Sequence, residues 1–382
     1  MLEFHKIEKE ILEFWEREKI YEKVKKKNSK GKKFYFLQGP PYTSGKLHFG
    51  HAWNNTLKDM AMRFWRMNGR DVWDRGGYDM HGLPTENATQ KRLGLNTKED
   101  IEKFGVEKFI KECIDFSIEY AGYMDEDLWK MGVWMDHKNA YKPITKDYIG
   151  GEWMFFKKAN EQGRLYKGKK VMHWDAHNGT SLAKHELEYK TVKDTSIFLK
   201  FKRKNTKNDY FIIWTTTPWT IPYNLAIMAN PHLEYVKIRV DDEYWIMAKS
   251  LVDIFMGAVV GKNFEVVEHF MGDELDGQEY EHFLAKDMPG VYESLKKEWK
   301  RTHSVIMSSE YVDTSAGTGL VHCAPGCGPE DQEIGARNGI GTFNTLDESG
   351  VLREVGKFSG MIAREDDDKF IKICLLYTSD AA

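Results

Sequence analysis

Apolar positions along the chain follow two different periods, and the change from one to the other comes near Gly168. Before that point, apolar residues recur every three or four positions over long stretches, which is typical of amphipathic helices. Two short apolar runs bounded by turn residues interrupt this pattern and indicate strands. The predicted helices cover 1–27, 53–67, 97–131 and 145–163, and the predicted strands cover 34–37 and 71–75.

After Gly168, short runs rich in β-branched and aromatic residues dominate the chain. Turns rich in Gly, Asn and Asp separate these runs, and this alternation predicts a second, mostly β domain. The predicted strands lie at 170–174, 196–201, 210–215, 235–240, 244–248, 264–267 and 319–323.

The turn between the first strand and the following helix, residues 39–51, combines glycines, prolines, a lysine and two histidines. A strand that enters a helix through such a turn can bind phosphate, because the helix N-terminus presents free N–H groups and partial positive charge. His48 and His51 are three positions apart and point the same way at a helix start. Gly50 between them leaves room for a flat ligand against the backbone. A glycine-rich turn with incidental histidines is the alternative interpretation.

The second strand also ends in a glycine-rich polar loop, residues 76–86. Ligands of open parallel sheets bind beyond the carboxyl ends of the strands, so we expect this loop and the 39–51 turn to face one crevice. Asp79 is placed to hold a cation such as an ammonium group. The alternative is that Asp79 caps the helix that follows.

Two polar segments of the β domain, 214–224 and 317–331, are candidates for a hydrolytic pocket. Hydroxyl, amide and imidazole groups can orient a water molecule and stabilise an oxyanion. From these residues alone, a threonine-rich strand and a Gly/Pro loop without chemistry is the favoured interpretation. The candidate residues are Thr215, Thr216, Thr217, Thr220, Asn224, His322 and Asp331.

Composition narrows the class of protein only a little. A chain of 382 residues is long enough for two or three domains. A net charge of -3 gives no global attraction to nucleic acid, so any such binding must come from local patches. Four scattered cysteines do not form a disulfide framework, and we expect a reducing, cytoplasmic compartment and no membrane segment.

Four segments together resemble the class I aminoacyl-tRNA synthetases, and among them the archaeal isoleucine enzymes. The turn His48-Phe49-Gly50-His51, in the context Pro-Pro-Tyr-x-x-Gly-x-x-His-x-Gly-His, looks like the HIGH signature. Residues 77–86 resemble the second motif of the isoleucine enzymes. The segment 215–224 is similar to their threonine-rich editing peptide, and 322–331 to the loop that partners it.

The resemblance implies an α/β fold, with the first half of a class I Rossmann-type (HUP) catalytic domain followed by an inserted, mostly β editing (CP1) domain. On this basis residues 1–150 are expected to hold an N-terminal helix and the half catalytic domain. Residues 151–190 are expected to form the connecting stem, and residues 191–382 the editing domain. The segment 374–382 fits no element of the family and is interpreted as a non-native tail.

The resemblance also implies an activity: ATP-dependent ligation of isoleucine to tRNA(Ile) through an isoleucyl-adenylate, with hydrolytic editing of Val-tRNA(Ile). It implies ATP and Mg²⁺ at the first site, tRNA(Ile) and isoleucine as partners, and a monomer. The implied catalytic residues are His48 and His51. The implied ATP site is Gly39, Gly45, His48, Gly50 and His51, the isoleucine site is Pro40, Pro41 and Asp79, and the editing site is the seven residues named above.

The chain departs from the family pattern in three respects. It has no KMSKS-like lysine loop, so we expect an N-terminal part that does not complete aminoacylation alone. Asp175 and Asn178 stand where relatives carry a Cys-x-x-Cys zinc knuckle, so no metal site is expected here. Cys327 replaces a histidine of the editing loop. A stand-alone editing deacylase and an inactive truncated product are the two alternative hypotheses.

Overall fold

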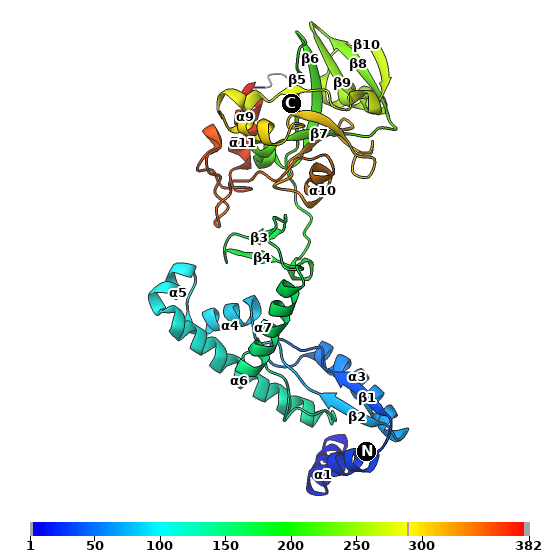
Figure 1. Cartoon of the computed structure of the whole chain (residues 1–382), viewed down its shortest axis with the longest axis vertical. Helices are drawn as coiled ribbons and strands as arrows, with labels where there is room; N and C mark the ends of the chain where they lie inside the picture. Colours follow the sequence, from blue (N-terminus) through cyan, green and yellow to red (C-terminus); the bar gives the residue numbers. More distant parts are fainter. Residues whose placement is uncertain (1–2, 289, 378–382) are drawn as a thin grey trace. The chain divides into compact units, whose positions relative to one another are not determined.

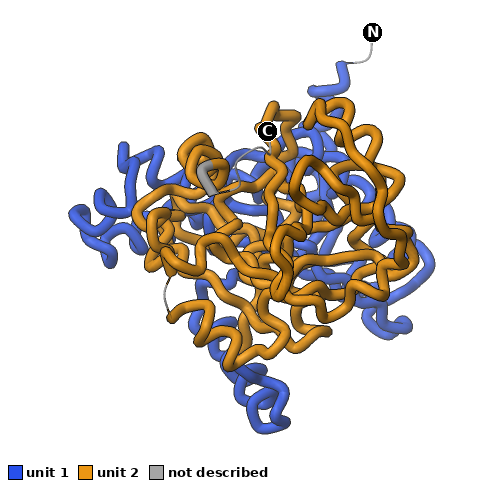
Figure 2. Tube along the Cα trace, turned by 90° about the horizontal axis from the view of Figure 1, so that it is seen from above, with its two compact units in different colours: residues 1–167 blue, residues 168–382 orange. Residues whose placement is uncertain are grey.

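The computed structural model describes residues 3–288 and 290–377. The chain forms two compact units, Met1–Lys167 and Gly168–Ala382, which Figure 2 shows in separate colours. The boundary coincides with the change of hydrophobic period at Gly168. It lies inside the predicted stem 151–190, and the finer division into three parts remains a prediction. Within the described residues, no helix combines the length and the apolar character that a membrane span requires.

Unit 1 is built on a parallel pair of strands, β1 (Lys33–Leu37) and β2 (Asp71–Arg75), as the sequence predicts. Helix α3 (Phe49–Met67) connects them and begins four residues before the predicted start. Parallel strands need such a crossover, which places the carboxyl ends of both strands and the N-terminus of the helix at the same edge of the sheet. A core of Met62, Val72, Leu128, Val133 and Met135 joins α3 and β2 to residues that come later in this unit.

The predicted single helix at 1–27 is wrong, because the structure has two helices, α1 (Phe4–Arg17) and α2 (Ile20–Asn28). Lys19 separates them with a left-handed φ of 49°. The break has a physical reason, since the turn redirects Tyr21 so that its hydroxyl donates to a buried carboxylate of β2. Hydrophobic spacing does not record this polar contact.

The remaining helices of unit 1 follow β2. The predicted helix at 97–131 is also divided, at Gly105, whose φ of 104° favours glycine. Thr97 and Asp100 form a capping box at the start of the first part, because the Asp100 N–H donates to Thr97 Oγ1 over 3.1 Å and the Thr97 N–H donates to Asp100 Oδ2 over 3.0 Å. The helices are α4 Leu83–Leu93, α5 Lys98–Phe104, α6 Val106–Lys130 and α7 Lys146–Glu161 (Figure 1).

Unit 2 begins with a small hairpin of β3 (His173–Asp175) and β4 (Thr180–Leu182). Within the described part of this unit, nine further strands form one mixed sheet. Their bounds are β5 Ile197–Arg203, β6 Asp209–Thr215, β7 Ala226–Ala229, β8 Glu234–Val240, β9 Glu243–Ala248, β10 Glu265–Met271, β11 Tyr280–Glu281, β12 Ser304–Met307 and β13 Leu320–Cys323. The sheet runs β10-β8-β9-β6-β13-β7-β12, with β5 paired to β6 and β11 to β5.

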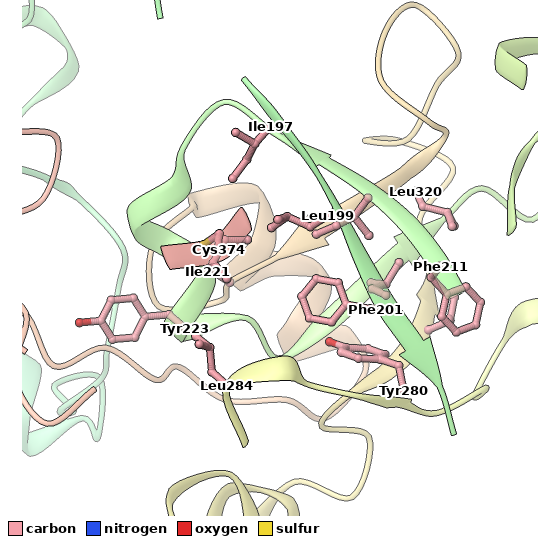
Figure 3. Packing of buried hydrophobic residues seen from close by; sticks show 14 of the residues in the cluster. Ile197, Leu199, Phe201, Phe211, Ile221, Tyr223, Tyr280, Leu284, Leu320 and Cys374 are labelled. Atoms are coloured by element: carbon pink, nitrogen blue, oxygen red, sulfur yellow. The ribbon is translucent and has the colours of Figure 1, made fainter. Parts of the chain in front are cut away.

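The largest core of the chain lies in unit 2 and joins β5, β6 and the segment after β6 (Figure 3). Cys374 is fully buried in it, on a helix, although the sequence placed this residue in a tail. The origin of that tail remains a prediction, and its residues 378–382 lie outside the described residues. The helices of the unit are α8 Val252–Phe255, α9 Val291–Glu298, α10 Pro329–Arg337 and α11 Asp367–Tyr377.

Candidate functional sites

The two histidines of the signature turn both cap helix α3. His48 is the N-cap residue, and its Nδ1 accepts the Gly50 N–H over 3.1 Å. The Nδ1 of His51 accepts the His48 N–H over 3.2 Å, and the two ring centroids are 3.9 Å apart. Because both Nδ1 atoms are acceptors, each neutral ring carries its proton on Nε2. The turn therefore presents two imidazole N–H donors beside a helix N-terminus.

Gly50 leaves space for the ring of His48. A Cβ atom at Gly50 would lie 3.0 Å from His48 Cε1, which is closer than such atoms normally come. Burial and the neighbouring His48 lower the pKa of His51, which keeps its imidazole neutral. Lys58 on the same helix reaches the strand end, where its Nζ donates to the Gly39 carbonyl over 3.3 Å. Neutral donors and a nearby cation suit the oxygens of a phosphate.

The loops after β1 and β2 lie side by side, as predicted. The Asp79 N–H donates to the Pro41 carbonyl over 2.8 Å, and the Thr43 N–H donates to the Asp79 carbonyl over 3.0 Å. Asp79 does not cap the next helix, because the N-cap of α4 is Gly82 and no side-chain hydrogen bond caps it. The structure thus brings Asp79 to Pro41, with Pro40 exposed in the same turn and Gly45 partly buried.

A glycine of the second loop has a packing role. A Cβ atom at Gly77 would lie 2.0 Å from the ring of Tyr141, so only glycine fits there. The Tyr141 hydroxyl donates to the Gln38 carbonyl over 2.6 Å, at the end of β1. Tyr141 therefore ties the two strand ends together and supports the loop on which Asp79 lies.

The threonine-rich segment and the predicted loop partner meet in unit 2. β13 lies between β6 and β7, which brings His322 beside the turn that follows β6. The Nε2 of His322 is 2.9 Å from Thr220 Oγ1, and its Nδ1 is 2.8 Å from Asn224 Nδ2. All three side chains are buried, and burial lowers the pKa of His322 to about 3. The histidine is therefore neutral at physiological pH.

The other threonines build the turn on which Thr220 is placed. The Thr217 N–H donates to Thr215 Oγ1 over 3.0 Å, and the Thr220 hydroxyl donates to the Thr217 carbonyl over 2.7 Å. Thr216 is exposed, with its Oγ1 3.5 Å from that of Thr217. A short 3-10 helix, Pro218–Tyr223, then leads to Asn224.

Asp331 lies in the first turn of α10 and is joined to the residue that follows β13. Its Oδ2 accepts the Ala324 N–H over 3.0 Å. Burial raises the pKa of Asp331 to about 6, while the Ala324 N–H opposes the shift. A Cβ atom at Gly328 would lie 2.9 Å from the same oxygen, so glycine makes space for this carboxylate.

Three further residues support the Thr220–His322–Asn224 cluster and were not found by sequence reasoning. The hydroxyl of Tyr280 donates to Asn224 Oδ1. The Nε2 of His303 is 3.2 Å from the Asn224 carbonyl, and the Nε2 of His282 is 3.1 Å from the Ile221 carbonyl. They lie 56 or more positions along the chain from their partners, so no local spacing could have indicated them.

The segment in place of the zinc knuckle forms a hairpin turn. Asp175 Oδ1 accepts the His177 N–H over 2.9 Å, and Asp175 Oδ2 accepts a hydrogen from Asn178 Nδ2. These bonds close the turn between β3 and β4. Among the described residues, no three His, Cys, Asp or Glu side chains are grouped to hold a metal ion.

With this geometry in place, comparisons identify the class of protein. The family model of tRNA synthetases class I (I, L, M and V) matches residues 10–299, so the chain belongs to that family. Its curated relatives include the isoleucine–tRNA ligase of Pyrococcus abyssi (strain GE5 / Orsay), 46% identical over 96% of this chain. The isoleucine–tRNA ligase of Methanocaldococcus jannaschii is 40% identical over 97% of the chain. These matches cover 35% and 36% of the relatives, so the chain spans about a third of their length.

The solved ternary complex of Agrobacterium radiobacter K84 agnB2 LeuRS-tRNA-LeuAMS is similar to this chain with a TM-score of 0.39. The sequence identity is 16%, over 97% of this chain and 47% of that one. The α/β fold expected from the sequence is confirmed by the family match and by the chain's own elements.

Proposed function

We propose that this chain carries two sites of an isoleucine–tRNA ligase, one for forming isoleucyl-adenylate and one for hydrolysing mischarged Val-tRNA(Ile). The observation that carries the first part is the contact of Pro41 and Thr43, in the 39–51 turn that also holds His48 and His51, with Asp79 at the parallel strand ends. The relatives' name supports isoleucine as the amino acid. Because the chain spans about a third of those relatives, ligation is proposed for a longer protein that contains it.

In the proposed first step, a carboxylate oxygen of isoleucine attacks the α-phosphorus of ATP, and the bond to pyrophosphate breaks. The Nε2–H groups of His48 and His51 donate to phosphate oxygens, where negative charge increases in the transition state. Asp79 holds the substrate ammonium group, and Pro40 and Pro41 contribute to the apolar wall for its side chain. Positioning and charge stabilisation together account for most of the catalysis in this class of transfer.

Mg²⁺ supplies charge neutralisation when it is bound to the phosphates. It prefers oxygen ligands and keeps several waters, so it is held largely through phosphate oxygens in nucleotide sites. The turn itself offers the two imidazole N–H donors, which suit the phosphates and not the ion. We therefore assign no residue of this chain to the metal.

The second site compensates for a limit on how strongly binding can discriminate isoleucine from valine. One missing methylene changes binding by only about 1–3 kcal/mol, and isoleucine enzymes discriminating against valine are the standard example of this limit. A hydrolytic second site removes the valine that passes the first. Water would attack the ester carbonyl, giving valine and free tRNA. Thr220, His322 and Asn224 would shape the pocket, and Asp331 would hold the ammonium group of the mischarged residue.

Pyrophosphate exchange tests the adenylation site. In a longer protein that contains this chain, His48→Ala should reduce isoleucine-dependent exchange by about 100-fold or more, because it removes a transition-state donor. His5→Ala alters a fully exposed histidine of the first helix and is the matched control. Exchange at the normal rate in His48→Ala would show that the turn is not catalytic.

A stand-alone deacylase is the second candidate function. It is favoured by one observation, namely that the Thr220–His322–Asn224 cluster and its supporting core lie entirely within unit 2. This candidate predicts hydrolysis of Val-tRNA(Ile) without pyrophosphate exchange. An inactive product predicts neither activity.

A further inference from the structure

Asn224 is the centre of a hydrogen-bond chain that runs from the hydrophobic core to the threonine-rich turn. Its Nδ2 donates to the Ala226 carbonyl over 3.0 Å and to His322 Nδ1 over 2.8 Å. Its Oδ1 accepts the hydroxyl of Tyr280. The side chain of Asn224 is fully buried and Tyr280 is 3% exposed, so water does not compete for these bonds. The oxygen and both N–H hydrogens of the Asn224 amide are thus each used in a hydrogen bond within the protein.

The direction of each bond follows from the Ala226 carbonyl, which can only accept. The amide group that faces it must be the NH₂ group, and the same nitrogen lies against His322 Nδ1. That ring nitrogen is therefore the acceptor and carries no proton. Since burial lowers the pKa of His322 to about 3, the ring is neutral, and its single proton is on Nε2.

The chain continues from His322 to the turn. The Nε2–H of His322 donates to Thr220 Oγ1 over 2.9 Å, and the Thr220 hydroxyl donates to the Thr217 carbonyl over 2.7 Å. Both ring nitrogens of His322 and the hydroxyl proton of Thr220 are therefore engaged in hydrogen bonds. Thr220 keeps one lone pair, with which it can accept a hydrogen bond from an N–H or O–H group of a ligand. In this arrangement His322 is a donor that orients Thr220 and cannot serve as a base toward water.

We propose that Tyr280 is a positioning residue of this hydrolytic site, whose hydroxyl holds the Asn224 amide in the orientation that makes His322 a hydrogen-bond donor to Thr220. The proposal rests on the proposed editing function and adds a residue and a proton arrangement to it. Without the tyrosine hydroxyl, Asn224 Oδ1 would be a buried acceptor with no donor, which is costly. The orientation of the amide would then depend on the Ala226 carbonyl alone.

The position of the Tyr280 hydroxyl is fixed by its surroundings. The ring packs edge-on to Phe201, with centroids 5.1 Å apart and planes at 79°, in the core that Figure 3 shows. Its backbone N–H donates to the His303 carbonyl over 3.0 Å. His303 in turn lies with Nε2 3.2 Å from the Asn224 carbonyl, which only accepts, so His303 also carries its proton on Nε2. The side chain and the backbone of Asn224 are thus both held by neighbouring residues.

The ring nitrogens of His322 give a direct test by ¹⁵N NMR on the full chain labelled with ¹⁵N-histidine, with His322→Gln to assign the signals. The wild-type protein should show an unprotonated Nδ1 and a protonated Nε2. Asn224→Asp should reverse this pattern or make both nitrogens protonated, because a carboxylate can only accept. Tyr280→Phe should move both signals toward a common average.

Tyr292→Phe is the matched control. It removes a buried tyrosine hydroxyl that donates to the Pro222 carbonyl over 2.8 Å, and it should leave the His322 signals unchanged. A protonated Nδ1 in the wild-type protein would overturn the proposal. So would wild-type ring signals in Tyr280→Phe, since the Ala226 carbonyl would then be sufficient alone.

Hydrolysis of Val-tRNA(Ile) provides the functional measurement. Tyr280→Phe should lower kcat by about tenfold or more with little change in KM, because only the transition-state geometry is altered. Tyr292→Phe should retain the wild-type kcat. If the wild-type chain does not hydrolyse Val-tRNA(Ile) while the NMR results hold, the proposed function fails and the positioning of His322 stands. Unchanged kcat in Tyr280→Phe would overturn the positioning role.

Discussion

Acid should destabilise unit 2 through its buried histidines, and His303 gives the clearest case. It is 7% exposed, and burial lowers its pKa to about 4, although the Asn224 carbonyl opposes the shift. An unfolded histidine titrates near 6.5, so between pH 6.5 and 4 the unfolded state binds more protons than the native state. Stability from this group is complete above pH 6.5 and is lost as the pH falls toward 4.

The magnitude follows from that difference in pKa. Each pKa unit corresponds to about 1.4 kcal/mol, so lowering the pH from 7 to 5 should cost about 2 kcal/mol through His303. His322, with a pKa of about 3, should cost a similar amount. Asp331 acts in the opposite direction, because its raised pKa of about 6 lets the native state bind a proton at a higher pH than the unfolded state does. Between pH 7 and pH 5 it should therefore offset about 1 kcal/mol of this loss of stability.

A difference between variants isolates the His303 contribution. Asn tolerates the left-handed φ of 58° at this position and does not titrate. His303→Asn should therefore lose about 2 kcal/mol less than the wild-type protein between pH 7 and pH 5. Native-state hydrogen exchange of the β7 and β12 amides, corrected for the intrinsic rates, measures the unfolding free energy of unit 2. His232→Asn, at an exposed site, is the control. Equal losses in His303→Asn and wild type would refute the reasoning.

Two further predictions concern buried carboxylates. Asp74→Asn should destabilise unit 1 by about 3–5 kcal/mol in urea unfolding, because it removes the counter-charge of the buried Arg66 guanidinium, 2.9 Å away. Asp71→Asn, whose partner Lys33 is exposed, should cost less than about 1 kcal/mol, and equal costs would contradict this account. For Asp331, the rate of Val-tRNA(Ile) hydrolysis should rise across pH 6 as the carboxylate ionises to hold the ammonium group. Asp331→Asn should be slower and lack this rise, and a retained rise would assign it to another group.

Much of unit 1 could be predicted because its signals are local. An apolar strand, a glycine-rich turn and an amphipathic helix follow one another in sequence, and the parallel pairing of β1 and β2 follows from their order. The break at Lys19 could not be predicted, since it serves a polar contact 53 positions away. Trp153 and Phe155, apolar residues of the helix predicted at 145–163, are both 70% exposed. Periodicity shows that a face is apolar and does not show what covers it.

The β unit was harder to predict. Strands β7 and β12 were missed, because each has four residues and β7 contains two alanines, which are poor strand formers. Burial on both sides, which defines β7 as a central strand, depends on the sheet around it. The threonine–histidine cluster was predicted only through resemblance to a family. Tyr280 could not be found, because a single hydroxyl reaching Asn224 leaves no pattern in the sequence.

Hydrolysis of mischarged tRNA by the 382-residue chain tests the central claim most directly. The chain should release valine from Val-tRNA(Ile) much faster than isoleucine from Ile-tRNA(Ile), and Thr220→Val should abolish the release of valine. Thr206→Val is the matched control, because that hydroxyl also donates to a backbone carbonyl, that of Arg203 over 2.8 Å. Wild-type hydrolysis in Thr220→Val, or equal rates on the two substrates, would contradict the assignment of an editing site to unit 2.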